Sequence, residues 1–320
     1  MKPMSMVGAF VMLVGFASSS AQAQVSQLPA NVGWAAELSG LLTSYWVTPN
    51  VTYLTASNVD LKLDVYQVAN GAIPAPGTAP KPTLLYIHGG GWTGLSKESS
   101  SLAVLPYLEL GWNVVNINYR LASTAPAPAA VEDCLCALRW VYRNAKQYNF
   151  DTSRIVVSGE SSGGHLALMT GMTPASAGLD RQCPGEETKV AAVVNWFGID
   201  DVAELLNGPT ARPFAITWLG SLPNRDEIAR RVSPLTYARA GLPPIITVHG
   251  DADPLVPYTQ AIRLRDALTK AGVPNELVTV SGGKHGGFTR DQMKTAYGSI
   301  LEFLTKQRVL TADAATTAQR

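Results

Sequence analysis

Short apolar runs, bounded by Gly, Pro or polar turns, recur along the chain from about residue 51 onward. Several are rich in Val and Ile, as expected for strands that are buried on both faces of a sheet. The runs predict strands at Val51–Ala56, Leu61–Gln67, Thr83–His88, Trp112–Asn118, Arg154–Ser158, Val190–Phe197, Ile245–His249 and Glu276–Val280.

Helix-like runs alternate with these strands. They predict helices at Ser99–Leu110, Ala129–Tyr148, Ser161–Met172, Tyr258–Ala271 and Phe288–Lys306. Alternating strands and helices indicate an α/β fold, in which a mainly parallel sheet carries helices on both faces. No helix lies between the first two strands, so we expect them to form an antiparallel start to the sheet.

One stretch, about residues 200–240, breaks this alternation. It contains no clear strand, but it holds Phe214, Trp218 and several prolines. An insertion here would lie above the C-terminal ends of the strands, where ligands bind in open α/β sheets. We therefore expect a short cap over a pocket, with an ordinary surface excursion as the alternative.

The two ends of the chain differ in composition from the rest. Lys2 precedes an apolar stretch and a small-residue run that ends at Ala21-Gln22-Ala23, the pattern of a secretory signal peptide. We expect a signal peptide over residues 1–23, a single α/β domain over 24–308 and a flexible tail over 309–320. This pattern predicts a secreted or periplasmic protein, and an uncleaved anchor is the alternative.

Composition narrows the function classes. The chain is 46% apolar and 15% charged, which is typical of a globular protein. Its formal net charge is +1, which indicates no basic surface for nucleic acid. After the first segment, no stretch is long and apolar enough for stable membrane insertion. We expect no metal or organic cofactor. Three cysteines without a nearby His cluster are a poor zinc signal.

The three cysteines are Cys134, Cys136 and Cys183. Export would permit a disulfide. Cys134 and Cys136 point to different faces of a predicted helix, so only one of them should suit Cys183. Three buried thiols are the alternative.

The segment Arg154–Ala167 contains the first candidate catalytic residue. A Val-rich strand runs into Gly159-Glu160-Ser161-Ser162-Gly163 and then into a helix. A serine on such a tight strand-to-helix turn needs small residues two positions before and after it. The turn exposes the hydroxyl, and the helix N-terminus adds positive potential beside it. Ser161 is therefore the predicted nucleophile, with Ser158 and Ser162 as weaker rivals.

Three consecutive glycines follow the strand that ends near His88. Acyl transfer creates an oxyanion, which preorganised backbone N–H groups stabilise, and an H-G-G-G sequence is the known partner of the serine turn. His88 is expected to stiffen this loop by hydrogen bonds and not to act as a base.

An acid and a base are expected downstream of the serine. Asp251 and Asp253 both follow the strand Ile245–His249; we favour Asp253 as the acid and expect Asp251 to hydrogen-bond its own turn. His285 lies on a Gly-rich loop after the last strand. It is the only histidine that follows both serine and acid, which gives the order nucleophile, acid, base; the other histidines are His88, His165 and His249.

These motifs resemble the hormone-sensitive-lipase-like branch of the α/β hydrolases, and more narrowly its feruloyl and acetylxylan esterase-like group. The resemblance spans roughly residues 51–306 and implies that the backbone amides of Gly90, Gly91 and Ser162 form the oxyanion hole. Many relatives have Ala where this chain has Ser162, which leaves the backbone N–H unaffected. The segments that match are His88–Trp92, Asn118–Arg120, Gly159–Ala167, His249–Pro257 and His285–Phe288.

Together these features predict a secreted serine carboxylesterase that acts on short-chain, carbohydrate or aryl esters, whether small molecules or polymer-borne. The cap is shorter than in many lipase-like relatives, which argues against long-chain lipids. The sequence gives no sign of an oligomeric state. Pocket wall and core are both open interpretations for the aromatic residues of this region, and those expected at the pocket are Trp92, Phe214, Trp218 and Phe288.

Two other functions fit parts of the pattern. A serine exopeptidase of the same fold would need an acidic pair for a free amine, for which Glu160, Glu204 and Asp200 are candidates. A noncatalytic ligand-binding homologue would have a degraded triad, whereas here every member is present.

Overall fold

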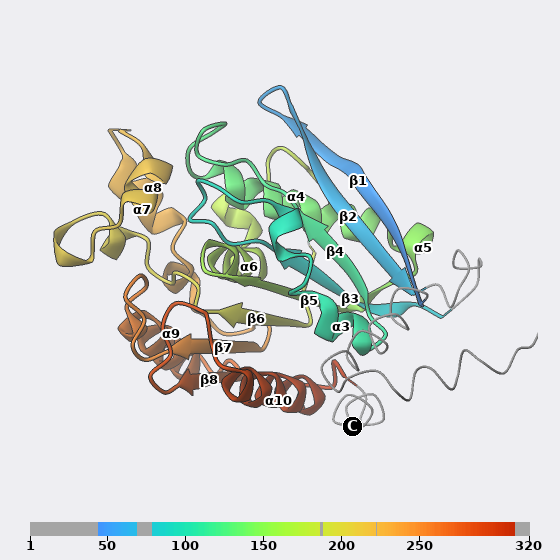
Figure 1. Cartoon of the computed structure of the whole chain (residues 1–320). Helices are drawn as coiled ribbons and strands as arrows, with labels where there is room; N and C mark the ends of the chain where they lie inside the picture. Colours follow the sequence, from blue (N-terminus) through green and yellow to red (C-terminus); the bar gives the residue numbers. More distant parts are fainter. Residues whose placement is uncertain (1–43, 69–78, 186–187, 222, 311–320) are drawn as a thin grey trace, which may run out of the picture. The chain divides into compact units, whose positions relative to one another are not determined.

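The computed structural model describes residues 44–68, 79–185, 188–221 and 223–310, so the expected signal peptide lies outside the described residues. All the predicted strands are present, and they form one eight-stranded sheet of order β1-β2-β4-β3-β5-β6-β7-β8 (Figure 1). The strands are β1 Tyr45–Ala56, β2 Val59–Val68, β3 Lys81–Ile87, β4 Asn113–Ile117, β5 Phe150–Glu160, β6 Ala192–Trp196, β7 Ile245–Gly250 and β8 Asn275–Val280.

The sheet begins antiparallel and continues parallel. β1 pairs with β2, and β2 with β4, in antiparallel register, whereas every pairing from β4 through β3 and on to β8 is parallel. The antiparallel start expected from the sequence is therefore confirmed. Because parallel strands end at a common edge, the loops after β3, β5, β7 and β8 meet at one side of the sheet.

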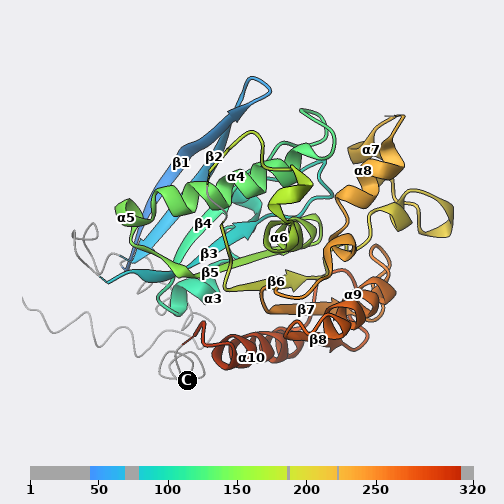
Figure 2. The same ribbon diagram turned by 180° about the vertical axis from the view of Figure 1, so that it is seen from behind.

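Alternate residues of the central strands pack into two separate hydrophobic cores, one on each face of the sheet. On β3, Leu85 and Ile87 face one core, whereas Leu84 and Tyr86 face the other. The two helical layers are visible in Figures 1 and 2. The first core lies under α4 Ala129–Arg143, α6 Ser162–Met172 and α9 Tyr258–Lys270, and the second lies under α3 Leu105–Glu109 and α10 Arg290–Lys306.

The expected cap is present. Residues 200–240 contain no strand in their described part, and their helices lie beside the strand ends (Figure 1). These elements are η4 Ala203–Leu205, η5 Gly208–Thr210, α7 Pro213–Leu219, α8 Arg225–Arg231 and η6 Pro234–Tyr237.

The strands β1 and β5 begin earlier than expected, and three larger differences from the sequence prediction concern two helices and the C-terminal end. The helix expected over Ser99–Leu110 is wrong: η2 Lys97–Ser100 and the short α3 replace it, because Pro106 favours a new helical start. The helix expected over Ala129–Tyr148 divides at Asn144 into α4 and α5 Ala145–Tyr148.

The third difference is at the C-terminal end. Val309 and Leu310 are buried in the second core, so the tail expected from residue 309 cannot begin there. Residues 311–320 lie outside the described part. Within the described ranges, no helix has the length and hydropathy needed to cross a bilayer.

A disulfide and a buried ion pair fix α4. Cys136 on α4 is bonded to Cys183, and Cys134 is a buried free thiol. Arg120, in the loop that follows β4, donates through Nε and Nη2 to the carboxylate of Asp133 at 2.7–3.0 Å. A fork of this kind suits guanidinium and carboxylate geometry. The choice that the sequence left open between Cys134 and Cys136 is therefore resolved in favour of Cys136.

Candidate active site

Ser161 lies on a strained turn between β5 and α6. Its φ of 55° is in the left-handed region, which a non-glycine residue adopts only at a cost in free energy. A Cβ on Gly159 or Gly163 would lie 2.4 or 2.1 Å from the carbonyl oxygen of Ile87 on β3. The two glycines are therefore required by close packing against β3, as the sequence indicated. The turn is also fixed by the Ser161 N–H, which donates to the Trp196 carbonyl at 2.9 Å.

The serine, the acid and the base meet in one hydrogen-bonded line. The Ser161 hydroxyl lies 2.8 Å from His285 Nε2, and His285 Nδ1 lies 2.7 Å from Asp253 Oδ2. Because a carboxylate only accepts, Nδ1 carries the proton and Nε2 is left to accept from the serine. The three predicted residues are thus brought together from the loops after β5, β7 and β8.

The carboxylate of Asp253 is held from several sides. Oδ1 accepts from the N–H groups of Leu255 and Val256 at 2.8 and 3.0 Å, and the side chain is fully buried. Burial opposes ionisation, but hydrogen bonds from His249, His285 and the Val256 N–H outweigh it and hold the pKa of Asp253 well below its usual range. Asp253 therefore stays ionised and fixes the orientation of the His285 ring.

His249 is a contact that the sequence analysis missed. Its Nε2 lies 3.2 Å from Asp253 Oδ2 and 3.2 Å from the Val256 carbonyl, so Nε2–H is shared between two acceptors. Among the described residues, its buried Nδ1 has no hydrogen-bond partner. A histidine at the end of a core strand gave no signal for this role. It contacts the same carboxylate oxygen of Asp253, Oδ2, as His285 does.

Asp251 has a different role from the one expected. Its Oδ1 accepts from the N–H of Gly282 at 2.7 Å, across 31 residues of sequence. The prediction that it bonds its own turn is therefore wrong. Instead, Asp251 links the loop that carries Asp253 to the loop that carries His285.

The glycine loop after β3 borders Ser161. Gly90 has a φ of 110°, and a Cβ there would lie 2.2 Å from the Gly94 carbonyl oxygen, so the turn excludes a side chain. Within the described residues, no acceptor engages the backbone N–H of Gly90, Gly91 or Ser162. These amides are free to bind an anionic oxygen beside the serine.

His88 stabilises this loop, as expected. Its Nδ1–H donates to the Gly89 carbonyl at 2.7 Å, and its ring stacks on Tyr119 at 4.3 Å. Burial lowers the pKa of His88 to about 4, so the ring is neutral at physiological pH.

Two aromatic residues expected at the pocket are in the core. Trp92 and Trp218 are fully buried and stacked on each other at 4.1 Å. The prediction that they line the pocket is therefore wrong. Trp92 Nε1 donates to His165 Nδ1 at 3.2 Å, while His165 Nε2 donates to the Val232 carbonyl in the cap. His165 thus joins the glycine loop, α6 and the cap, and burial lowers its pKa to about 4.

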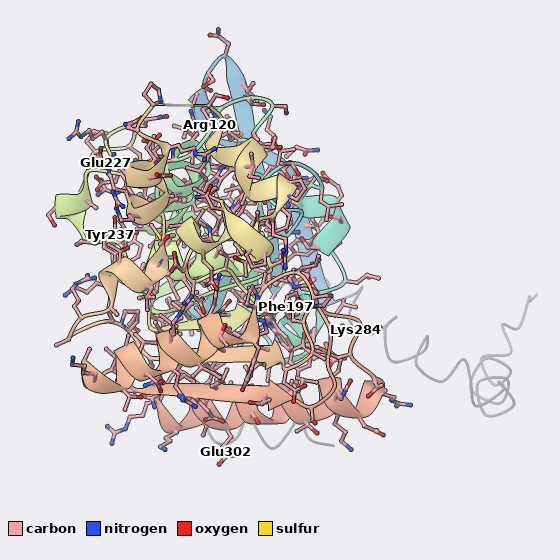
Figure 3. The ribbon with its side chains drawn as sticks, turned by 90° about the vertical axis from the view of Figure 1, so that its left-hand side faces the viewer. Arg120, Phe197, Glu227, Tyr237, Lys284 and Glu302 are labelled. Carbon is pink, nitrogen blue, oxygen red and sulfur yellow. A yellow bond between two sulfur atoms is a disulfide. The ribbon has the colours of Figure 1, made fainter. Side chains whose placement is uncertain are left out.

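The other two expected aromatic residues lie on two different cavities. Phe214 of α7 lines a cavity of about 500 Å³ together with Ser161, His285 and the glycine loop; we call it the catalytic cavity. Phe288 lines a second cavity of about 400 Å³, which we call the aromatic cavity. In Figure 3, which faces the side where the cap lies, Phe197 is seen between the yellow cap helices above and the red C-terminal helices below. Phe197 borders both cavities.

Comparison with known proteins agrees with this architecture. A family model described as BD-FAE matches residues 63–268, which is more than half of the chain. The chain belongs to the BD-FAE family. A second model, described as TAP-like protein, matches residues 224–316. The resemblance to esterase-like α/β hydrolases is therefore confirmed, and the BD-FAE match includes the serine turn and Asp253 but ends before His285.

Relatives of this BD-FAE protein include mycobacterial esterases. Esterase LipQ of Mycobacterium tuberculosis is 29% identical over 205 residues, which cover 62% of this chain and 48% of LipQ. Carboxylesterase NlhH of the same organism is 30% identical over 212 residues, covering 64% and 66% of the two chains. The chain spans about half the length of the first of these relatives.

Solved structures give the same family. The native thermophilic esterase Est2 of Thermogutta terrifontis superimposes with a TM-score of 0.68 at 29% identity, covering 84% of this chain and 94% of that one. A truncated carbohydrate esterase from gut microbiota gives 0.68 at 27% identity, covering 83% and 97%. Among the described residues, no group of His, Cys, Asp or Glu side chains is placed to hold a metal ion.

Proposed function

We propose that the protein is a carboxylesterase in which Ser161 is the nucleophile, His285 the general base and Asp253 the residue that orients it. The observation that carries this proposal is the continuous hydrogen-bonded line Ser161–His285–Asp253, with distances of 2.8 and 2.7 Å. Its esterase relatives and the unengaged amides beside the serine support the same reaction.

The proposed reaction has two acyl-transfer steps. His285 Nε2 takes the proton of Ser161 as Oγ attacks the ester carbonyl, and the amides of Gly90, Gly91 and Ser162 bind the oxyanion. The C–O bond to the alcohol then breaks, and His285 returns the proton to the leaving oxygen. Water, activated by the same base, releases the acid and restores the serine.

We propose short-chain, aryl or carbohydrate esters as substrates. The catalytic cavity has a volume of about 500 Å³ and the cap is short, which suits a small acyl group better than a long chain. The Thermogutta relative is described with propionate and with butyrate bound, and another relative as a carbohydrate esterase. A series of p-nitrophenyl esters of increasing chain length tests this; highest kcat/KM for acyl groups of ten or more carbons would contradict it.

We also propose that the protein is exported. The pattern of residues 1–23 and the disulfide Cys136–Cys183 both suit an oxidising compartment. Expression in a host with an export pathway should give a mature chain that begins at Gln24, detected by N-terminal sequencing of the periplasmic or extracellular fraction. A chain that keeps Met1 and stays with the cells would contradict export.

Labelling with a phosphoryl ester tests the nucleophile directly. Paraoxon, which is described on the Thermogutta relative, should transfer its diethylphosphoryl group to Ser161 Oγ as p-nitrophenolate leaves. Ser161→Ala should lose this label and about a million-fold in kcat on p-nitrophenyl acetate. Ser158→Ala, which changes the rival serine on β5, is the matched control and should keep the label. A label that remains in Ser161→Ala would overturn the assignment.

The exopeptidase alternative lacks its acidic pair. Glu204 is ion-paired with Arg263, and Asp200 is fully buried. Of the three candidates, only Glu160 lines the catalytic cavity or the aromatic cavity. An ester hydrolase therefore fits the described site better.

A further inference from the structure

The aromatic cavity adjoins the catalytic cavity. The two share Glu160, Phe197 and the glycines Gly286 and Gly287, which follow His285. A substrate whose carbonyl lies at Ser161 can therefore extend one part into the aromatic cavity. The rings that line this second cavity are Tyr86, Trp196, Phe197, Phe288 and Tyr297.

Glu160 is the only charged side chain among the residues that line the aromatic cavity, and no Lys or Arg lines either cavity. In the described part of the chain, its carboxylate forms no hydrogen bond or ion pair. Burial raises the pKa of Glu160, and the nearby His285 opposes that shift. The junction of the two cavities thus holds one acidic group without a protein partner.

This combination favours one class of ligand. A partly buried carboxylate without a partner is stabilised by a cation, and the faces of Trp, Tyr and Phe rings also attract cations. An anionic group would meet Glu160 with no compensating base. A neutral apolar group would fill the cavity but leave the carboxylate desolvated and unpaired.

We propose that the aromatic cavity binds an organic ammonium group of the substrate, with Glu160 as its counter-ion. The protein would then prefer esters that carry a positive charge over neutral esters of the same shape. This inference rests on the proposed esterase function. The ammonium group belongs either to a quaternary ammonium alcohol or to a primary amine on the acyl side.

Two matched substrate pairs test the proposal and separate these sources. Acetylcholine and 3,3-dimethylbutyl acetate have the same shape but differ in charge on the alcohol. Alanine ethyl ester and ethyl isobutyrate provide the corresponding pair on the acyl side. For one pair, kcat/KM of the cationic ester should exceed that of the neutral ester by about tenfold or more. A ratio near or below one for both pairs would overturn the proposal.

Glu160→Gln tests the counter-ion while keeping the shape of the side chain. Since Glu160 adjoins Ser161, the readout is the ratio between the two esters and not the absolute rate. The ratio should fall to within about twofold of one. A cationic preference that survives in Glu160→Gln would rule out the counter-ion role.

Binding of phenyltrimethylammonium gives a readout that does not depend on turnover. Calorimetry with the wild-type protein should detect binding, and Tyr297→Leu should weaken it by about tenfold. Phe214→Leu, in the catalytic cavity, is the matched aromatic control and should leave the dissociation constant within about twofold. Absent binding would overturn the cation site. Binding without hydrolysis of p-nitrophenyl acetate would instead overturn the proposed esterase function alone.

Discussion

Reduction of the disulfide should lower the stability of the fold by an amount that follows from its position. Cys136 and Cys183 are 47 residues apart, and each lies within the buried core. A cross-link across a loop of this length lowers the entropy of the unfolded chain, which stabilises the folded state by about 4 kcal/mol in the chain-entropy treatment. We therefore expect the free energy of unfolding to fall by about 4 kcal/mol on reduction.

Urea denaturation with and without a phosphine reductant measures this difference. Reduction leaves every other side chain in place, so no cavity term enters the comparison. Cys134→Ala is the control, because it removes the one thiol that can exchange with the bridge and should lose the same free energy on reduction. A loss below about 1 kcal/mol would refute the reasoning, since it would mean that the bridge barely restricts the unfolded chain.

Two further predictions concern buried polar groups. Burial raises the pKa of Asp200 to about 8, so the folded state keeps a proton that the unfolded state has lost above about pH 4, and stability should fall as pH rises toward 8. Asp200→Asn should therefore be more stable than wild type at pH 8, and the difference in stability should be smaller at pH 5. Urea denaturation midpoints measure this difference, with Asp201→Asn as the control. A difference in stability that does not depend on pH would contradict the prediction. His249→Leu should lower kcat about tenfold or more, because Asp253 loses the hydrogen bond that helps to fix it. His249→Gln can restore a donor and should recover part of the lost kcat. Equal rates and equal pH profiles for the two variants would show that the hydrogen bond has no role.

The site was predictable where local sequence dictates local geometry. The turn at Ser161 needs glycines on both sides because β3 lies against it, and that need is visible in five residues. Asp253 and His285 could be chosen because each follows a strand end. The helix expected over Ser99–Leu110 failed for a local reason too, since Pro106 outweighed the apolar pattern.

Other features depend on packing that no local pattern encodes. Trp92 follows the glycine loop and looks like a pocket wall, but its φ of 58° and its stack on Trp218 place it in the core. His249 ends a core strand, so its contact with Asp253 depends on how the next turn folds back. The choice of Cys136 over Cys134 likewise depends on which face of α4 meets the loop that holds Cys183.

The hydrogen bonds of His165 couple the glycine loop to the cap, so a change in one is felt by the other. His165 accepts from Trp92 on one nitrogen and donates to the Val232 carbonyl on the other, so only the neutral ring satisfies both. Protonation near pH 4 would turn the accepting nitrogen into a donor that faces the N–H of Trp92. Acid should therefore loosen the glycine loop and the cap in a single titration. By the same coupling, a bulky ligand that displaces the cap would also disturb the glycine loop beside Ser161.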